Sequence, residues 1–247
     1  MKKMKKRSRI ILIFVICVVV AAGAVLGGVG IWYYTMMYPA APVLQEGVIR
    51  IACVGDSLTY GYGIKDRKHN SYPAQLQALL GDDYQVLNYG LSRRSLQKDV
   101  KKPNTSYVNE DFYEISQQSA PDIVIIAIGS NDTRPDNWNA ANYEKELEEF
   151  VRVYQNLDSA PVVYLMLPPP FYEHKTPHSN EILSNELIPI ITRVGAKTDV
   201  VVIDLHTPLT GVPELFQKDG LHPTAEGATI IATTVYESLV DMFQPFK

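Results

Sequence analysis

Short apolar runs alternate with amphipathic segments along most of this chain. Five runs rich in β-branched residues predict strands, and apolar residues at i, i+3, i+4 and i+7 spacing predict helices between them. The predicted strands are Val48–Val54, Gln85–Asn88, Asp122–Ile128, Pro161–Leu167 and Val200–Asp204. The predicted helices are Tyr72–Leu80, Asn142–Leu157 and Thr224–Phe243.

This order of elements predicts an α/β fold. The run Asp122–Ile128 is apolar throughout, as expected of a strand that is covered on both faces. Strands that alternate with helices favour right-handed crossovers and a parallel sheet between two helical layers. We therefore expect a three-layer α/β/α sandwich around a five-stranded parallel sheet. In such folds function gathers at the carboxyl ends of the strands, so the residues that follow each strand are the candidates.

The N-terminal part has a different pattern. The 25 residues Ile10–Tyr34 carry no charge, and six Lys and Arg residues lie within the first nine positions. As a helix the run would be about 37 Å long, more than the roughly 30 Å of a hydrocarbon core. The preceding basic residues and the aromatic Trp32–Tyr34 predict a single-pass anchor with a cytoplasmic N-terminus and an extracellular body. The alternative is a signal peptide cleaved at Ala22–Ala24, which would release a secreted protein.

These patterns divide the chain into four parts: a basic tip (1–9), a transmembrane segment (10–34), a linker (35–47) and the body (48–247). The whole chain has a formal charge of −4, but 17 basic and 27 acidic residues follow Arg9. An acidic body argues against nucleic acid as a partner, because nucleic-acid binding needs clustered Lys and Arg. The same acidity favours neutral acylated sugars over anionic polymers.

Chemically useful residues follow the predicted strands. Ser57 lies between the first strand and a short helix, where a nucleophile is well placed. Gly90 follows the second strand, and its small size lets a backbone N–H approach a substrate. Asn131 follows the third strand and offers an amide donor. Asp219 precedes His222 by three residues, so its carboxylate can orient the imidazole ring and support the imidazolium that forms when a serine loses its proton.

Four blocks carry these residues in order: GDSLT (55–59), NYG (88–90), GSND (129–132) and DGLHP (219–223). Each block is weak alone, but together they resemble the SGNH hydrolases, also called GDSL esterases, from Val48 to about Phe243. The resemblance implies a flavodoxin-like sheet order and a serine esterase without a metal or cofactor.

The resemblance also implies a role for each residue. Ser57 would be the nucleophile, His222 the general base and Asp219 the residue that orients it. The backbone N–H groups of Ser57 and Gly90 and the side-chain amide of Asn131 would form the oxyanion hole. Each such donor contributes about 3–4 kcal/mol to stabilisation of a tetrahedral oxyanion.

Other residues have weaker claims. Asp56 and Trp138 are candidate substrate contacts, although Asp56 is more readily explained as a brace for loop amides and Trp138 as packing. His206 is a rival base because it follows Asp204 closely, but it lacks the DGLHP setting. His174 and His178 are four residues apart with Pro177 between them, which argues against a helical metal site.

We therefore expect an extracytoplasmic serine esterase that acts through an acyl-enzyme. The segment from Gly129 to Trp138 is most similar to carbohydrate O-acetylesterases, so an acetylated carbohydrate is the expected substrate. The alternatives are a lysophospholipase, short-chain lipase or thioesterase, and an acyltransferase to glycans. A non-catalytic surface binding module is a further alternative.

Overall fold

The computed structural model describes residues 23, 25, 27–31, 33–102, 104–172 and 177–243. The chain divides into two compact units, Met1–Ala40 and Ala41–Lys247. Most of the predicted membrane segment (10–34) lies outside the described residues, and those described in the first unit are helical up to Met37. Among the described residues, no helix combines the length and apolar character that crossing a membrane requires.

The second unit is built on one five-stranded sheet, and all of its strands run parallel. Their order across the sheet is β2 (Tyr84–Gly90), β1 (Ile49–Gly55), β5 (Ile123–Ala127), β6 (Val162–Leu167) and β7 (Val201–Asp204). This order confirms the predicted fold, and each predicted strand end lies within two residues of the observed one.

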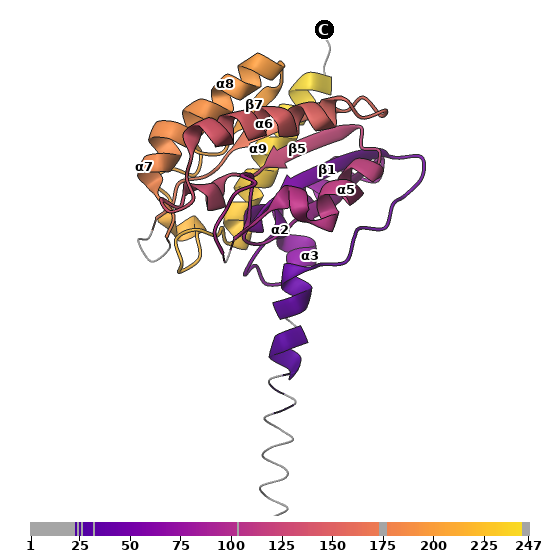
Figure 1. The fold of residues 1–247 in the computed structure, drawn as a ribbon. Coiled ribbons are helices and arrows are strands. Elements are labelled where there is room, and N and C mark those ends of the chain that lie inside the picture. The colour runs from indigo at the N-terminus through magenta and orange to yellow at the C-terminus, as the bar shows by residue number, and fades with distance from the viewer. Residues whose placement is uncertain are drawn as a thin grey trace, which may run out of the picture. The chain divides into compact units, whose positions relative to one another are not determined.

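Helices cover both faces of the sheet (Figure 1). One layer consists of α4 (Tyr72–Leu80) and α9 (Ala225–Phe243), and the other of α5 (Asp111–Gln118), α6 (Ala140–Gln155) and α8 (Ile188–Thr198). Alternate residues of β1 enter opposite cores: Ile51 and Cys53 pack towards α4 and α9, and Ala52 and Val54 pack towards the other layer. Period-two alternation of buried side chains therefore supplies both cores from the same strand.

Several short elements complete the body. They are α2 (Ser57–Tyr60), α3 (Arg67–Asn70), α7 (Asn180–Ile182), the π-helical turn η3 (Leu183–Leu187), the paired β3 (Arg94–Ser95) and β4 (Thr105–Ser106), and the 3₁₀ turns η1 (Tyr107–Asn109), η2 (Ser130–Thr133) and η4 (Pro213–Leu215). Most lie in the loops that connect the sheet to its helical layers.

The helix predictions were less complete than the strand predictions. Helix α4 has the predicted bounds, and α6 and α9 begin within two residues of theirs. Helices α5 and α8 were not predicted. Helix α8 contains a proline, a glycine and β-branched residues, which lower helix propensity. It is stabilised instead by tertiary packing, because Ile190, Ile191 and Val194 are buried in the core shared with α6.

The sheet order places a topological switch point between β1 and β5. Strand β1 is followed in sequence by β2 on one side, whereas β5 is followed by β6 on the other. Ligands in open α/β sheets bind in the crevice outside the carboxyl ends of strands at such a point. Ser57 follows β1 and Asn131 follows β5, so both lie at this crevice.

Candidate active site

The turn after β1 brings Ser57 to the end of the sheet. A Cβ on Gly55 would lie 2.4 Å from the Ala127 carbonyl oxygen, so only glycine fits where the chain leaves the strand. Asp56 then caps α2 by accepting the N–H of Leu58 at 3.0 Å. Ser57 is the first residue of α2, so its own N–H has no acceptor within the helix.

A second loop, between β7 and α9, carries the other two residues of the predicted triad. The Asp219 carboxylate accepts the backbone N–H groups of Leu221 and His222, each at 3.0 Å, which shapes the turn. The same carboxylate lies 2.7 Å from His222 Nδ1, and His222 Nε2 lies 2.9 Å from Ser57 Oγ. The structure therefore joins Ser57, His222 and Asp219 in one chain of hydrogen bonds across 165 residues of sequence.

The electrostatics of Asp219 suit this arrangement. Partial burial alone would raise the pKa of its carboxyl group. The hydrogen bonds from the His222 ring and backbone, the charge interaction with His222 and the Leu221 N–H outweigh burial and lower the pKa to about 2. The carboxylate is therefore ionised at neutral pH and fixes the His222 tautomer whose Nε2 can accept a proton.

A pocket of about 270 Å³ opens at the triad. Its lining includes all three triad residues and several neutral or basic side chains. These are Tyr62, Ser92, Arg93, Asn104, Asn131, Arg134 and His178. Ser57 and His222 are only 6% and 9% exposed, so the reacting groups lie at the bottom of this pocket and not on an open surface.

Asn131, the predicted side-chain donor of the oxyanion hole, lines the pocket. Its side-chain nitrogen lies 3.0 Å from the Arg94 carbonyl oxygen and 3.3 Å from an Asp56 carboxylate oxygen. An amide nitrogen has two hydrogens, and both of those on Asn131 already face protein acceptors. A substrate oxyanion would therefore have to share one of these hydrogens with the acceptor already present. The bond to Asp56 is the longer of the two.

The geometry does not support the predicted role of Gly90 as an oxyanion donor. Its N–H donates to the Asn88 side-chain oxygen at 2.9 Å, and Gly90 is not part of the pocket wall. A Cβ at this position would lie 2.1 Å from the Tyr60 backbone nitrogen. Glycine is required here because the end of β2 packs directly against the backbone of α2.

The next turn of this loop reaches the pocket instead. Ser92 and Arg93 line it, and Arg93 has a left-handed backbone with φ of 65°. This conformation costs a non-glycine residue about 1–2 kcal/mol, and such outliers cluster at functional sites. No sequence signal pointed to Arg93, because a left-handed position favours glycine or asparagine.

Neither of the two candidate substrate contacts, Asp56 and Trp138, lies on the pocket wall, and the structure favours the structural explanation of each. Asp56 is completely buried, and that burial is the main reason its pKa rises to about 7. It braces the Leu58 N–H and Asn131 and has no surface for a substrate. Trp138 lies outside the pocket wall, donates its ring N–H to Glu186 at 2.8 Å and packs against Tyr143.

Of the remaining described histidines discussed as candidates, His178 lines the pocket and His206 does not. His206 lies 3.3 Å from the Pro168 carbonyl oxygen and does not line the pocket, so it does not compete with His222 as the base. His174 lies outside the described residues. His178 lines the pocket, and its burial, followed by the charges of His222 and Arg134, lowers its pKa to about 4. The His178 ring is therefore neutral at physiological pH.

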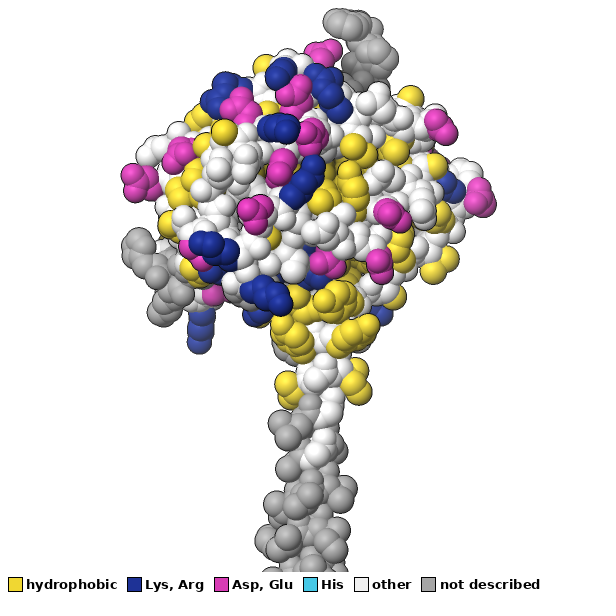
Figure 2. Space-filling view, viewed as in Figure 1, with side chains coloured by type: hydrophobic (Ala, Val, Ile, Leu, Met, Phe, Trp, Pro, Cys, Tyr) yellow, Lys and Arg dark blue, Asp and Glu magenta, His cyan; other side chains and the backbone are white. Residues whose placement is uncertain are grey.

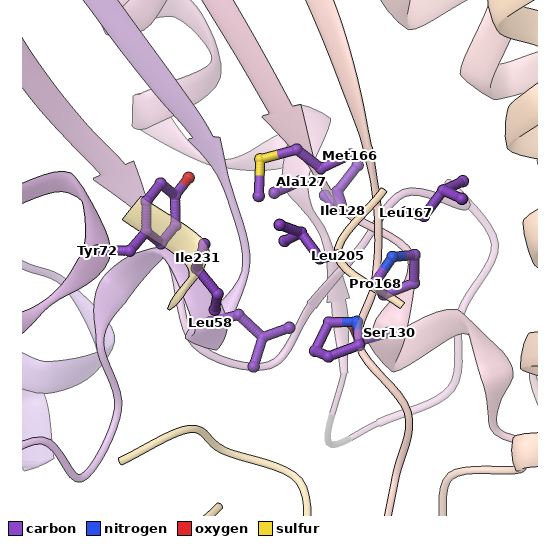
Figure 3. A pocket seen from close by; sticks show the side chains of 11 residues that line it. Leu58, Tyr72, Ala127, Ile128, Ser130, Met166, Leu167, Pro168, Leu205 and Ile231 are labelled. Atoms are coloured by element: carbon purple, nitrogen blue, oxygen red, sulfur yellow. The ribbon is translucent and has the colours of Figure 1, made fainter. Parts of the chain in front are cut away.

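A much smaller cavity lies beneath the strand ends (Figure 3). Leu58 and Ser130, which are next to Ser57 and Asn131 in sequence, line it together with apolar side chains such as Met166, Leu205 and Ile231. Its volume is about 10 Å³, which barely reaches the size needed for one water molecule. This cavity therefore cannot receive an acyl chain unless its walls move.

Comparisons with known proteins agree with this geometry. Residues 53–230 match the GDSL-like Lipase/Acylhydrolase family, and the chain belongs to it. Family membership and the Ser57 site place the chain among the carboxylic ester hydrolases. This confirms the resemblance that the four sequence blocks carried.

Individual relatives are more specific. The chain is 30% identical over 212 residues to an acetylxylan esterase of Xylanibacter ruminicola, covering 78% of this chain and 44% of that protein. The chain thus spans less than half the length of this relative. A carbohydrate acetylesterase family member from Sinorhizobium meliloti has a similar fold, with a TM-score of 0.63, 21% identity and coverage of 79% and 99%. A lipase/acylhydrolase from Enterococcus faecalis gives a TM-score of 0.62 at 24% identity, covering 81% of this chain and all of that one.

Proposed function

We propose that this protein is a carbohydrate O-acetylesterase that acts outside the cytoplasm through an acyl-enzyme. The observation that carries the proposal is the hydrogen-bonded chain from Ser57 through His222 to Asp219, at 2.9 and 2.7 Å. A serine hydroxyl is a weak nucleophile until a base removes its proton, and this chain places the base within reach. The name of the Xylanibacter relative supports the acetylated carbohydrate.

The proposed reaction has two stages. Ser57 Oγ attacks the ester carbon while its proton passes to His222 Nε2, and the C=O electron pair moves to the carbonyl oxygen. Asn131 and the N–H of Ser57 are the candidate donors to that oxyanion. His222 then returns the proton to the leaving sugar oxygen as the C–O bond breaks. Water, activated by His222, hydrolyses the acetyl-Ser57 ester and restores the enzyme.

The proposed location rests on the sequence. The basic tip and the uncharged run Ile10–Tyr34 favour a membrane anchor with the body outside the cytoplasm. Protease treatment of intact cells tests this prediction. The body should be digested in intact cells if it is exposed, and it should be protected if it faces the cytoplasm.

The enzymatic proposal is tested with a fluorophosphonate probe and with acetate release from acetylated xylan. The wild-type body should be labelled once per chain and should release acetate, and Ser57→Ala should do neither. Aryl esters of increasing acyl length then test the substrate class. A fall in kcat/KM from acetate to octanoate supports the acetylesterase, whereas a rise would favour a lipase or lysophospholipase.

A further inference from the structure

Tyr62 is an aromatic residue beside the triad that no sequence motif assigned. It follows α2 by two residues and lines the pocket. Its ring centroid lies 4.5 Å from that of the His222 imidazole, and the two ring planes are inclined by 41°. The Tyr62 ring therefore covers part of one face of the imidazole, whereas the triad uses the two nitrogens at its edge.

Hydrogen bonds hold Tyr62 in this place. Its N–H donates to the Ser57 carbonyl oxygen at 3.0 Å, which ties it to the nucleophile. The Gln217 side-chain amide donates to the Tyr62 carbonyl oxygen at 2.7 Å, and the Gln217 backbone N–H donates to the His222 carbonyl oxygen at the same distance. Gln217 thus connects the two loops that carry the Tyr62 and His222 rings.

The adjacent Gly63 makes this connection possible. A Cβ on Gly63 would lie 2.1 Å from the Gln217 side-chain oxygen, and the backbone there is left-handed with φ of 72°. Glycine adopts this left-handed backbone without strain, and a side chain here would displace the Gln217 amide from its bond to Tyr62. These contacts fix the backbone position from which the Tyr62 ring extends towards His222.

The charged and titratable groups around His222 contact the nitrogens at the edge of its ring or line the pocket, and the Tyr62 ring lies at its face. Asp219 lies at Nδ1 and Ser57 at Nε2, and the His178 ring, which is neutral at physiological pH, lines the same pocket. Arg93 and Arg134 are cations that also line this pocket. His222 becomes a cation each time it takes the serine proton, and a cation within about 6 Å of an aromatic face is stabilised by it.

We propose that Tyr62 is a positioning residue that holds the His222 imidazole in the plane of the triad and stabilises its imidazolium form. This inference rests on the proposed function. The imidazolium forms when Ser57 Oγ bonds to the ester carbon and its proton moves to His222 Nε2. It persists until the leaving oxygen takes that proton, so an interaction with the cation lowers the barrier on both sides of the intermediate.

The test compares Tyr62→Leu with Tyr62→Phe on p-nitrophenyl acetate, a substrate without a sugar. Tyr62→Leu should lower kcat about three- to tenfold with little change in KM, because it removes the aromatic face. Tyr62→Phe should remain within about twofold of wild type, because phenylalanine keeps that face. The acidic limb of the kcat/KM profile should move to lower pH in Tyr62→Leu only. Tyr236→Leu, which alters a half-buried tyrosine on α9, is the matched control and should leave kcat unchanged.

Rates are normalised to the fraction of chains that a fluorophosphonate labels at completion, so a partly unfolded variant is not mistaken for a slow one. Equal kcat values and pH profiles in the Leu and Phe variants would overturn the inference. A higher KM on acetylated xylan with unchanged aryl acetate kinetics would also overturn it, because Tyr62 would then contact the sugar. Failure of the proposed function is distinguishable, since wild-type protein itself would neither be labelled nor release product.

Discussion

Substitution of Gly90 by alanine separates a packing role from a catalytic one. Alanine keeps the backbone N–H, so a pure hydrogen-bond donor at this position would tolerate the change. In the structure, however, the added Cβ would lie 2.1 Å from the Tyr60 nitrogen and 2.6 Å from the Thr59 carbonyl carbon. Both are backbone atoms of α2, so no side-chain rotation relieves the overlap.

The expected magnitude follows from this overlap. Favourable carbon contacts lie near 3.5–4.0 Å, so the end of β2 and α2 must separate by more than 1 Å. Overpacking of this kind costs typically 1–3 kcal/mol and occasionally more. We expect about 3 kcal/mol for Gly90→Ala, which for a body of this size lowers Tm by about 6–12 °C. Because α2 carries Ser57, we also expect a lower kcat than in wild type at temperatures at which the variant is still folded.

Thermal unfolding followed by circular dichroism measures this effect. Gly211→Ala is the control, because Gly211 has φ of 83° but no atom within 4 Å of its added Cβ. That variant pays only for the left-handed backbone, about 1–2 kcal/mol, and should lose about 2–8 °C. A Gly90→Ala protein that melts within 2 °C of wild type would refute the packing explanation, and lost activity at unchanged Tm would return Gly90 to the oxyanion hole.

Two further predictions concern titratable groups. Asp219→Asn should lower kcat about 10³–10⁴-fold by removing the carboxylate that orients His222. In the same aryl acetate assay, the kcat of His206→Ala should stay within twofold of the wild-type value. The reverse order of the two effects would make His206 the base. Burial raises the pKa values of Asp56 and Asp132 from 3.8 to about 7. Between these values the folded state binds more protons than the unfolded state, so the contribution of the two groups to the free energy of unfolding is full below about pH 4 and falls as the pH rises to 7. Urea titrations should show this fall, and Asp132→Asn should flatten it; a stability that climbs over the same range would contradict the assignment.

The triad was predictable because its residues follow strands that the sequence marks clearly. The apolar runs fix where β1 and β5 end, and parallel strands bring those ends together. Ser57 and Asn131 therefore had to be neighbours once the fold was recognised. The DGLHP turn is equally local, since Asp219 shapes it through N–H groups two and three residues away. Short-range geometry of this kind is visible in a sequence.

The wall of the pocket was not predictable in the same way. The sequence shows a glycine at the end of β2 but not which backbone it must approach. In the structure the α2 backbone, and not a substrate, occupies the space beside it. Tyr62 and His178 reach the pocket through loops whose course depends on tertiary contacts such as those of Gln217. Asp56 stands next to Ser57, yet the strand-to-helix turn directs its side chain into the core.

The net charge of the body does not describe the charge in the pocket. The face of the body in Figure 2 carries acidic and basic side chains interspersed among the described residues, without one dominant sign. In the pocket, Arg93 and Arg134 accompany Ser57, and the Arg134 side chain is only 16% exposed and pairs with Asp136 at 3.2 Å. Exposed charges more than about 8–10 Å away are largely screened at physiological salt. The net charge behind the sequence-based preference for neutral sugars therefore acts on a bound ester less strongly than these two guanidinium groups, and the side chains of the pocket wall determine which substrate charge the site favours.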